Sequence, residues 1–506
     1  MIKKIATILL MGMLSVQGIT QEKYVTRADD DYENYSFSPA IDIYKTVLDK
    51  GYVSEDLLKK LGNSYYFNAD YKEAASIYGR LIADYGSEVG PEYLFRYAQT
   101  LKTLGKYGEA ESFMTQFTDS TTDDLRATYF NEEKDYLEEI EKNSGRYQIL
   151  PFEYNSPYSD FAPSYYGEGL IFASDRDTGN FARYRHTWNA KDFLDLYKVN
   201  ADSVSFDKVA KLNDEINTRL HESSSITTKD GQTLYFTRNN FIEGKYVKDN
   251  KGVIRLKIFK ADWLDGEWQN IQELPFNSDS YSVAHPALSP DGRTLFFSSD
   301  MPGTIGGPDL FKVSINGDGS FGTPINLGST INTEARETFP FVTSEEVLYF
   351  SSDGHPGLGG LDVFATKIAE GNLNGRVVNV GKPVNGNNDD FTFIFDEGNR
   401  KGFFASNRDE GMGADDIYGF LETIPLNLDC DQRVSGTVRD KISNEVLVGA
   451  TVKIINENNE EVLAVITDAN GKYELTVDCN KGNFVRASIE GYVPSEEYLG
   501  KSEGKP

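Results

Sequence analysis

The stretch "HPALSPDGRTLFFSSDMPGTIGGPDLF" spans residues 285–311 and contains the unit that decides the fold. A Pro-Asp-Gly turn signal leads to an apolar run, paired serines and a Gly-Gly-x-Asp loop before the next apolar run. The central run, "LFFSSD" at 295–300, recurs as "LIFASD" (170–175), "LYFTRN" (234–239), "LYFSSD" (348–353) and "GFFASN" (402–407). Short apolar runs between such turns predict repeated antiparallel strands rather than strand–helix–strand units.

Two further features accompany each run. An Asn stands 17 to 20 residues before the central Phe of each run, at Asn155, Asn217, Asn277, Asn332 and Asn385. After the run comes a strand that begins with Asp195, Asp309, Asp362 or Asp416, whereas the second unit has Lys257 at this place. One unit is too small to bury its own faces, so we expect the units to assemble radially into a WD40-like β-propeller over residues 146–420.

The two ends of this region predict how the propeller closes. "RYQILPFEYNS" (146–156) has the pattern of an outer strand followed by the marker Asn, yet no unit precedes it. The last unit ends after "DDIYGF" without an outer strand of its own. We therefore expect residues 146–153 to complete the final sheet beside residues 415–420, which gives five blades. Six blades are the alternative, if a degenerate blade lies in residues 176–200.

The acidic residues at the strand starts allow two interpretations. A carboxylate there can accept hydrogen bonds from turn amides and from neighbouring hydroxyls such as those of Ser298 and Ser299. Asp residues in Gly-rich loops could instead bind calcium through their oxygens. These residues recur once per unit and do not cluster in the sequence, so we favour the structural role and expect no cofactor. Both interpretations concern Asp195, Asp309, Asp362 and Asp416.

The N-terminal part has a helical apolar period that repeats. "LLKKLGNSYYFNADYKEAASIYGRLIADY" (57–85) is followed by "YLFRYAQTLKTLGKYGEAESFM" (93–114), with Gly62 and Ala98, Tyr71 and Tyr107, and Ala74 and Ala110 each 36 residues apart. This spacing resembles the tetratricopeptide repeat (TPR), which implies a TPR array over residues 22–143. "SPAIDIYKTVLDKG" would be an earlier half-unit, and residues 122–143 a polar capping helix.

Stacked repeats of this kind form a concave groove, which predicts a dock for a peptide or protein. The candidate groove residues are Asn63, Tyr66, Arg96 and Gln99.

Composition points to an exported protein that does not bind nucleic acid. Residues 1–18 have Lys3 and Lys4, an apolar run and small residues at the end, which is typical of a secretory signal peptide. The net charge of −28 disfavours nucleic acid and anionic lipid as partners. Cys430 and Cys479 are the only cysteines, and an oxidising compartment favours a disulfide between them, with free buried thiols as the alternative.

The motifs of common enzymes do not emerge from the sequence. "GDGSFG" (317–322) fits a phosphate-binding pattern, but it lies between two expected strands with no helix after it, so we interpret it as a hairpin turn. There is no G-x-S-x-G and no H-E-x-x-H, and the four histidines are far apart in the sequence. We therefore predict no catalytic residues.

The C-terminal part alternates apolar and polar residues. Its segments "SGTV", "GATV" and "TDANGKY" resemble the carboxypeptidase regulatory-like domain, a small β-sandwich without catalytic residues, here expected over residues 430–495. The chain as a whole is thus expected to combine an α-helical array with two all-β modules.

This order of modules resembles the periplasmic OmpA-family proteins of Bacteroidota, including the PorE-like component of type IX secretion. The resemblance implies a non-enzymatic periplasmic scaffold at the outer membrane, docked to a β-barrel protein of the PorP/SprF type and supporting secretion or gliding. Family members continue into an OmpA-like domain that binds peptidoglycan, and we do not expect residues up to Pro506 to bind peptidoglycan directly. A receptor that binds a glycan or peptide at the propeller mouth, near the loop 239–255, is the alternative.

Overall fold

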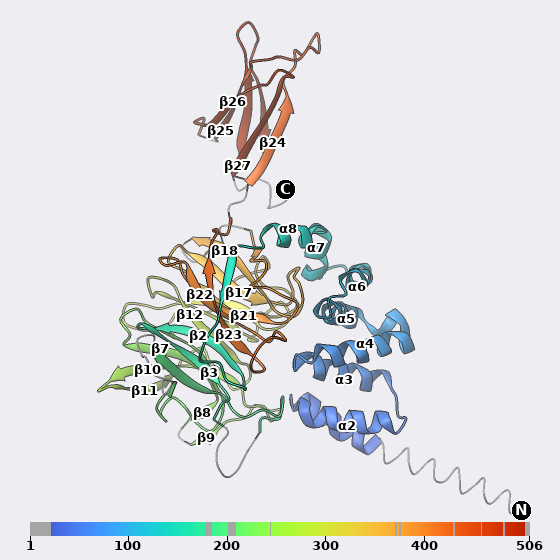
Figure 1. The fold of residues 1–506 in the computed structure, drawn as a ribbon, viewed down its shortest axis with the longest axis vertical. Coiled ribbons are helices and arrows are strands. Elements are labelled where there is room, and N and C mark those ends of the chain that lie inside the picture. Colours follow the sequence, from blue (N-terminus) through green and yellow to red (C-terminus); the bar gives the residue numbers. More distant parts are fainter. Residues whose placement is uncertain are drawn as a thin grey trace, which may run out of the picture. The chain divides into compact units, whose positions relative to one another are not determined.

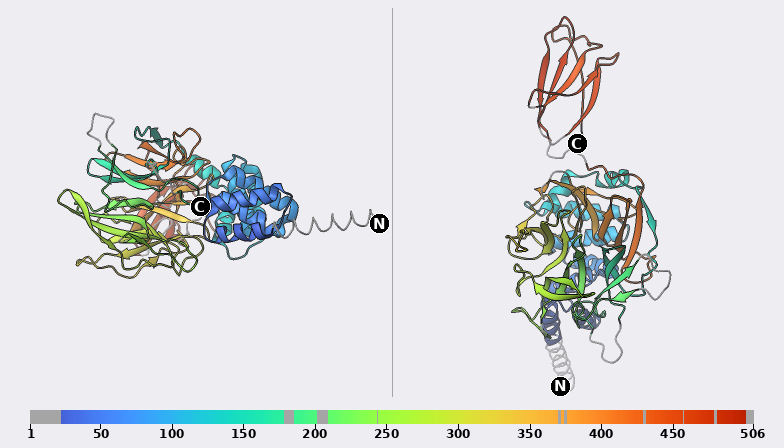
Figure 2. Two further views of the ribbon diagram at one scale, coloured as in Figure 1. Left: turned by 90° about the horizontal axis from the view of Figure 1, so that it is seen from below. Right: turned by 90° about the vertical axis from the view of Figure 1, so that its left-hand side faces the viewer.

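A computed structural model gives the fold (Figure 1 and Figure 2). It describes residues 22–177, 185–200, 209–242, 244–369, 372–373, 376–428, 431–456, 458–478 and 481–500. The expected signal peptide, Cys430 and Cys479 lie outside the described residues. The chain divides into two compact units: Met1–Ala365 with Asn379–Leu426, and Thr366–Val378 with Asn427–Pro506.

The first unit begins with stacked helices. Residues 22–33 are helical, and then come α2 (Phe37–Asp49), α3 (Glu55–Phe67), α4 (Tyr71–Tyr85), the 3-10 turn η1 (Gly86–Val89), α5 (Pro91–Thr103), α6 (Tyr107–Asp119), α7 (Leu125–Glu132) and α8 (Tyr136–Lys142). Helices α3 and α4 pack as a pair, α5 and α6 pack as a second pair, and α4 contacts α5. A Cβ added at Gly62 would lie 2.5 Å from the Tyr78 ring, which is why a small residue is needed where α3 meets α4.

Two details of the helices differ from the expectation. The helix at 22–33 precedes α2, so "SPAIDIYKTVLDKG" is not an isolated half-unit. The expected single capping helix over 122–143 is two short helices, α7 and α8, separated by a break at residues 133–135.

Five antiparallel sheets follow the helices within the described residues. The first contains β2 (Asp160–Tyr166), β3 (Gly169–Ser174), β4 (Asp195–Asn200) and β5 (Ala210–Lys211). The second contains β6 (Glu222–Thr227), β7 (Thr233–Asn239), β10 (Leu256–Leu264) and β11 (Glu267–Glu273), with the hairpin β8 (Phe241–Ile242) and β9 (Lys245–Tyr246) between β7 and β10.

The remaining sheets continue the same order. The third contains β12 (Val283–Leu288), β13 (Thr294–Ser299), β14 (Asp309–Ser314) and β15 (Ile325–Asn326). The fourth contains β16 (Glu337–Val342), β17 (Val347–Ser352), β18 (Asp362–Ala369) and β19 (Asn372–Leu373), and β20 (Val378–Asn379) also pairs with β18. The fifth contains β21 (Asp390–Asp396), β22 (Lys401–Ser406), β23 (Asp416–Glu422) and β1 (Tyr147–Leu150).

The sheets are arranged in a closed ring. The first strand of each sheet contacts the first strand of the next, in the order β2, β6, β12, β16, β21 and back to β2. Strand β1 pairs with β23, with Tyr147 opposite Glu422 and Leu150 opposite Gly419. The strand that follows the helices is therefore the outer edge of the last sheet, at the place where residues 146–153 were expected.

Aromatic side chains fill the axis of the ring. The register of each first strand shifts at a bulge, and four bulge residues have left-handed φ angles: Ala162, His285, Phe339 and Thr392. The centroid of the Phe339 side-chain ring lies 6.5 Å from that of Phe161, 5.4 Å from that of Phe391 and 3.9 Å from that of the His285 imidazole. The bulges thus turn large side chains from different sheets toward one another.

The second unit contains a small sandwich. The sheet of β24 (Asp431–Thr437) and β27 (Lys472–Asp478) packs with the sheet of β26 (Glu461–Ile466), β25 (Thr451–Asn456), β28 (Asn483–Ser488) and β29 (Ser495–Leu499). Its core includes Val434, Ile454 and Val477. In "TDANGKY", the Asp468 carboxylate accepts the amides of Asn470 and Lys472, and Gly471 takes the left-handed φ of 68° that closes the turn.

Candidate functional site

The five marker asparagines join neighbouring sheets of the ring. The carboxamide oxygen of each accepts an amide from the third strand of the preceding sheet at 2.7–3.1 Å, and its nitrogen donates to the carbonyl of that same residue at 2.7–3.0 Å. We call each pair of bonds an asparagine clamp. Asn155, which precedes the first sheet, binds Ile417 of the last one, so the clamp also spans the closure of the ring.

The acidic residues at the strand starts have local partners. Asp309 accepts the Ile305 amide at 2.9 Å and the Asn326 carboxamide at 2.6 Å, so the expected hydroxyls of Ser298 and Ser299 are not its partners. Those hydroxyls donate instead to the carbonyls of Glu337 and Ser282.

The other three acidic residues also have local partners, although Oδ1 of Asp309, Asp362 and Asp416 is buried without a partner among the described residues. Asp362 accepts the Leu358 amide at 2.7 Å, Asp416 accepts the Gly413 amide at 2.9 Å, and Asp195 pairs with Lys211 at 2.7 Å. Within the described part of the chain, no three His, Cys, Asp or Glu side chains are grouped so that they could hold a metal ion.

The last residue of each repeated run fixes the mouth of the ring. Its side-chain oxygen, from Asp175, Asn239, Asp300, Asp353 or Asn407, accepts the amide of the residue just before each first strand at 2.6–3.0 Å. The five residues that donate these amides occupy equivalent places but carry four kinds of side chain. We call them the mouth residues: Ser159, His221, Ser282, Arg336 and Asp389. A rigid backbone with varied side chains is typical of a binding surface.

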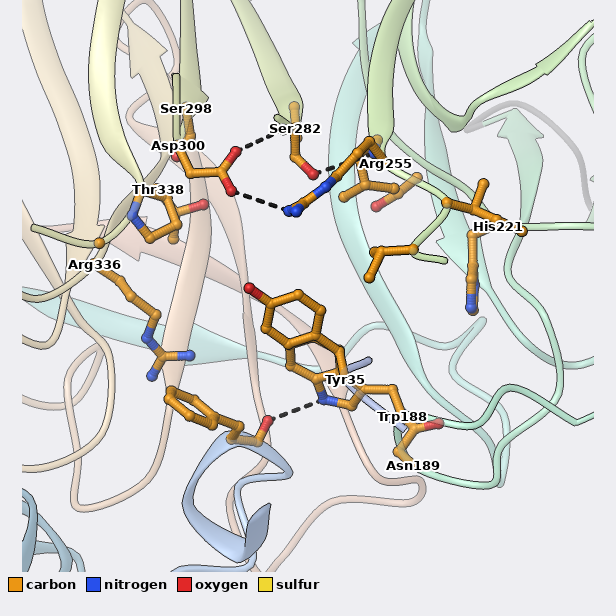
Figure 3. A pocket seen from close by; sticks show the side chains of 18 of the residues that line it. Tyr35, Trp188, Asn189, His221, Arg255, Ser282, Ser298, Asp300, Arg336 and Thr338 are labelled. Atoms are coloured by element: carbon orange, nitrogen blue, oxygen red, sulfur yellow. Dashed lines mark hydrogen bonds and ion pairs between the residues drawn. The ribbon is translucent and has the colours of Figure 1, made fainter. Parts of the chain in front are cut away.

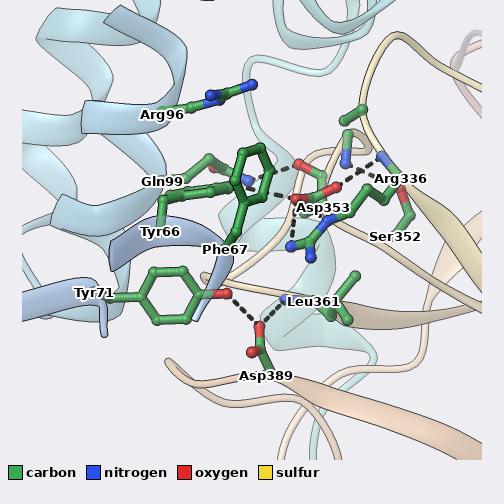
Figure 4. Close-up of polar contacts among 12 residues, drawn as sticks. Tyr66, Phe67, Tyr71, Arg96, Gln99, Arg336, Ser352, Asp353, Leu361 and Asp389 are labelled. Carbon is green, nitrogen blue, oxygen red and sulfur yellow. Dashed lines mark hydrogen bonds and ion pairs between the residues drawn. The ribbon is translucent and has the colours of Figure 1, made fainter. Parts of the chain in front are cut away.

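Asp353 and the mouth residue Asp389 hold the helices against the ring (Figure 4). Arg336 donates through Nε and Nη2 to Asp353 at 3.0 and 2.8 Å, and the Tyr66 hydroxyl donates to the same carboxylate oxygen at 3.1 Å. Gln99 donates to the Asp353 carbonyl at 2.7 Å. The Tyr71 hydroxyl donates to Asp389 at 2.7 Å.

The prediction of an open groove along the helices is therefore wrong at its central residues. Tyr66 and Gln99 are buried against the ring of the same chain. Asn63 is buried among helices and accepts the Tyr78 hydroxyl at 2.8 Å and Arg96 at 2.6 Å. The ring's own loops cover this face at Tyr66 and Gln99, whereas Arg96 is half-buried and lines the cavity described next.

A cavity of about 1220 Å³ lies between the ring mouth and the helices (Figure 3). Three mouth residues line it, namely His221, Ser282 and Arg336. The loop that links β7 to β10 contributes residues 252–256 and Lys248. The sequence pointed to this loop as a feature of the propeller mouth, and the cavity is at that place.

The loop before β4 forms an aromatic wall of the cavity. Trp188 donates through Nε1 to the Phe67 carbonyl at 3.2 Å, so it joins the ring to α3. Its indole stacks on Tyr35 with centroids 6.0 Å apart and meets the edge of Phe37 at 4.8 Å. The sequence did not indicate Trp188 or Tyr35 as site residues, because neither belongs to a repeated motif.

Histidines of the cavity wall are half-buried and neutral. Burial lowers the pKa of His186 to about 4 and that of His285 to about 3, and it lowers the pKa of His221 as well. Nδ1 of His221 accepts the Leu194 amide at 3.1 Å, and Nδ1 of His285 lies 2.7 Å from the Ser224 hydroxyl. These rings pack in the cavity wall, and that of His221 accepts a hydrogen bond.

Comparison with known proteins identifies one module. The carboxypeptidase regulatory-like domain matches residues 433–505. The C-terminal module is a carboxypeptidase regulatory-like domain. No curated protein matches the chain. None of the described helices is long and apolar enough to cross a membrane.

Solved structures show only distant likeness. An α-L-arabinofuranosidase from Lactobacillus brevis is 8% identical, with 51% of this chain and 90% of that chain covered and a TM-score of 0.33. A GH43_1 enzyme from Xanthomonas citri complexed with xylose is 11% identical, covering 57% and 92%, with a TM-score of 0.35. A puromycin hydrolase is 11% identical, covering 67% and 51%, with a TM-score of 0.31. At such scores these likenesses carry no argument about activity.

Proposed function

We propose that the protein is a non-enzymatic periplasmic scaffold that docks to an outer-membrane β-barrel protein of the PorP/SprF type. In this role it supports type IX secretion, gliding or related cell-envelope machinery. The ring is a five-bladed WD40-like propeller in this proposal, and the helices are a TPR array, as in the OmpA-family proteins of Bacteroidota.

One observation supports a scaffold above all. The helices and the ring are joined by buried polar contacts into one unit, while the carboxypeptidase regulatory-like domain belongs to a separate unit. Buried, fully bonded carboxylates hold a fixed geometry, which suits a platform that positions other proteins. The two units provide separate surfaces for different partners.

Co-purification from detergent-extracted outer membranes tests this proposal. Full-length tagged chain should recover a β-barrel protein at a defined ratio, and deletion of residues 431–500 shows which unit binds it. A chain that elutes alone under crosslinking conditions would contradict the scaffold role.

The cavity favours a second candidate, a periplasmic receptor that binds a glycan or a peptide at the ring mouth. Ligand pockets are commonly 300–1,000 Å³ and combine apolar walls with a few polar groups, and this cavity of about 1220 Å³ is large enough for several residues or sugars. A thermal-shift screen of short peptides and oligosaccharides tests this role. Saturable stabilisation supports it, and a flat response to both libraries contradicts it.

A further inference from the structure

The acidic side chains that line the cavity already accept hydrogen bonds from the protein. Asp300 accepts the Ser282 amide at 2.6 Å and pairs with Arg255 at 3.3 Å. Asp353 pairs with Arg336, and Glu334 accepts the Leu125 amide at 3.0 Å. Glu92 likewise pairs with two arginines. The carboxylates of the wall are thus part of the protein's own bonding.

Several donors of the same wall remain available. Arg336 uses Nε and Nη2 for Asp353, and among the described residues its Nη1 has no partner. Arg126 is 4% exposed, and its Nη1 is buried without a partner in the part of the chain described. The Tyr35 hydroxyl has no protein partner among the described residues either, and it points toward the side of the cavity with Arg336 and Asp300 (Figure 3).

The charge of the wall agrees with this surplus of donors. Six basic and four acidic side chains line the cavity, whereas the whole chain has a net charge of −28. Asp124 and Asp249, outside the lining, pair with Arg126 and Arg255, so the wall is close to neutral in a strongly acidic protein. Its free donors can therefore bind an anion, because charge-assisted bonds to a carboxylate are stronger than neutral ones.

We propose that the cavity binds the carboxylate of a short peptide, with Arg336 and the Tyr35 hydroxyl as its donors. This inference rests on the receptor role proposed above and names its ligand. The guanidinium is well suited because Asp353 fixes it, and Asp353 in turn is fixed by Tyr66. A donor held in this way loses little freedom on binding.

The aromatic wall favours a peptide over a sugar. A sugar site offers an open aromatic face, but here Tyr35 and Trp188 stack on each other and the edge of Phe37 meets the indole. The wall therefore presents ring edges and a hydroxyl. These groups suit apolar side chains and a hydrogen-bonded carboxylate.

Tryptophan fluorescence titration of the full-length protein tests the proposal. The probes are one tetrapeptide library in three forms: free C-terminus, C-terminal amide, and C-terminal amide with an internal Glu. We expect saturable binding of at least one carboxylate form and about tenfold or weaker binding of the plain amide. The free-terminus and Glu forms distinguish a terminal from a side-chain carboxylate.

Two variants assign the donors. Tyr35→Phe removes a hydroxyl that no group of the described residues uses, so it should weaken binding about tenfold without changing the melting temperature. Tyr246→Phe, 49% exposed and outside the cavity, is the matched control and should bind as the parent does. Arg336→Lys should weaken binding at least as much as Tyr35→Phe, and the circular dichroism spectrum checks its fold.

The outcomes separate this inference from the receptor role. Equal affinity for the acid and amide forms, or an unchanged affinity of Tyr35→Phe, overturns the inference. Binding of oligosaccharides in place of peptides also overturns it but leaves the receptor role standing. If neither peptides nor oligosaccharides show saturable binding, both this inference and the receptor role are wrong.

Discussion

The contacts inside the ring and the contacts between the ring and the helices differ in kind. Inside the ring, one asparagine clamp recurs at every sheet junction, and each clamp binds backbone atoms alone. At the helices, two carboxylates, Asp353 and Asp389, each make contacts that occur once. The ring therefore repeats one polar contact at every sheet junction, whereas the helices are attached by contacts that each occur once, among them those of Asp353, Asp389 and Trp188.

Loss of Asp353 should have the largest effect. Asp353→Ala removes the partner of Arg336 and Tyr66 and leaves a guanidinium that is only 29% exposed without its counterion. We expect a loss of about 2–4 kcal/mol in the free energy of unfolding, measured by urea denaturation. Hydrogen exchange should rise in α3 and α5. Asp123→Ala, on the exposed surface, is the control, and equal effects of the two substitutions would contradict a central role for Asp353.

Loss of one clamp should cost somewhat less. Asn332→Ala leaves the buried amide of Leu310 without a partner, whereas the Leu310 carbonyl keeps the bond from the Leu327 amide, and we expect about 1–3 kcal/mol. Asn155→Ala should act in the same direction by a smaller amount, because Asn155 is only half-buried. Asn316→Ala in an exposed turn is the control. Hydrogen exchange in the helices should stay unchanged. A rise there would show that the asparagine clamps and the contacts between helices and ring are not independent.

A buried carboxyl of the ring predicts a pH dependence. Burial raises the pKa of Glu337 to about 8, against an ordinary value of 4.5. The unfolded chain then binds fewer protons than the folded chain between pH 4.5 and 8, so stability falls as pH rises through this window by up to about 1.4 kcal/mol per pH unit. Glu337→Gln should make this fall less steep, and Glu267→Gln, at an exposed site, should leave it unchanged. Parallel stability curves for both variants would contradict the raised pKa.

Two equivalent tyrosines give the smallest and sharpest comparison. Tyr71 and Tyr107 stand 36 residues apart in the repeat, but the Tyr71 hydroxyl makes a buried bond to Asp389 and that of Tyr107 an exposed bond to Asn387. We expect Tyr71→Phe to cost about 1–2 kcal/mol and Tyr107→Phe about 0.5 kcal/mol or less. Similar costs would show that burial against the ring does not decide the contribution.

Repeated features of the fold were predictable from the sequence. The apolar runs, the marker asparagines and the terminal Asp or Asn of each run recur because each performs the same local bonding at every sheet. The small residue at Gly62 and the motifs of the C-terminal domain have local causes as well.

Features that occur once were not predictable in the same way. Nothing in the repeat spacing indicates that Tyr66 and Gln99 are covered by the loop at Asp353, because that contact joins two surfaces without a shared pattern. The left-handed bulge at Phe339 is also invisible in the sequence, since bulky residues rarely adopt positive φ. Trp188 and Tyr35 meet only after the ring has closed.

Closure of the ring by the strand after the helices is the claim on which the comparison depends. Gln148 in β1 lies opposite Leu421 in β23. In a chain with Cys430 and Cys479 replaced by Ser, Gln148→Cys with Leu421→Cys should form a disulfide under mild oxidation, whereas Gln148→Cys with Glu267→Cys, in β11 of another sheet of the ring, should not. Failure of the first pair to crosslink in the folded protein, or equal crosslinking of the second, would contradict this closure.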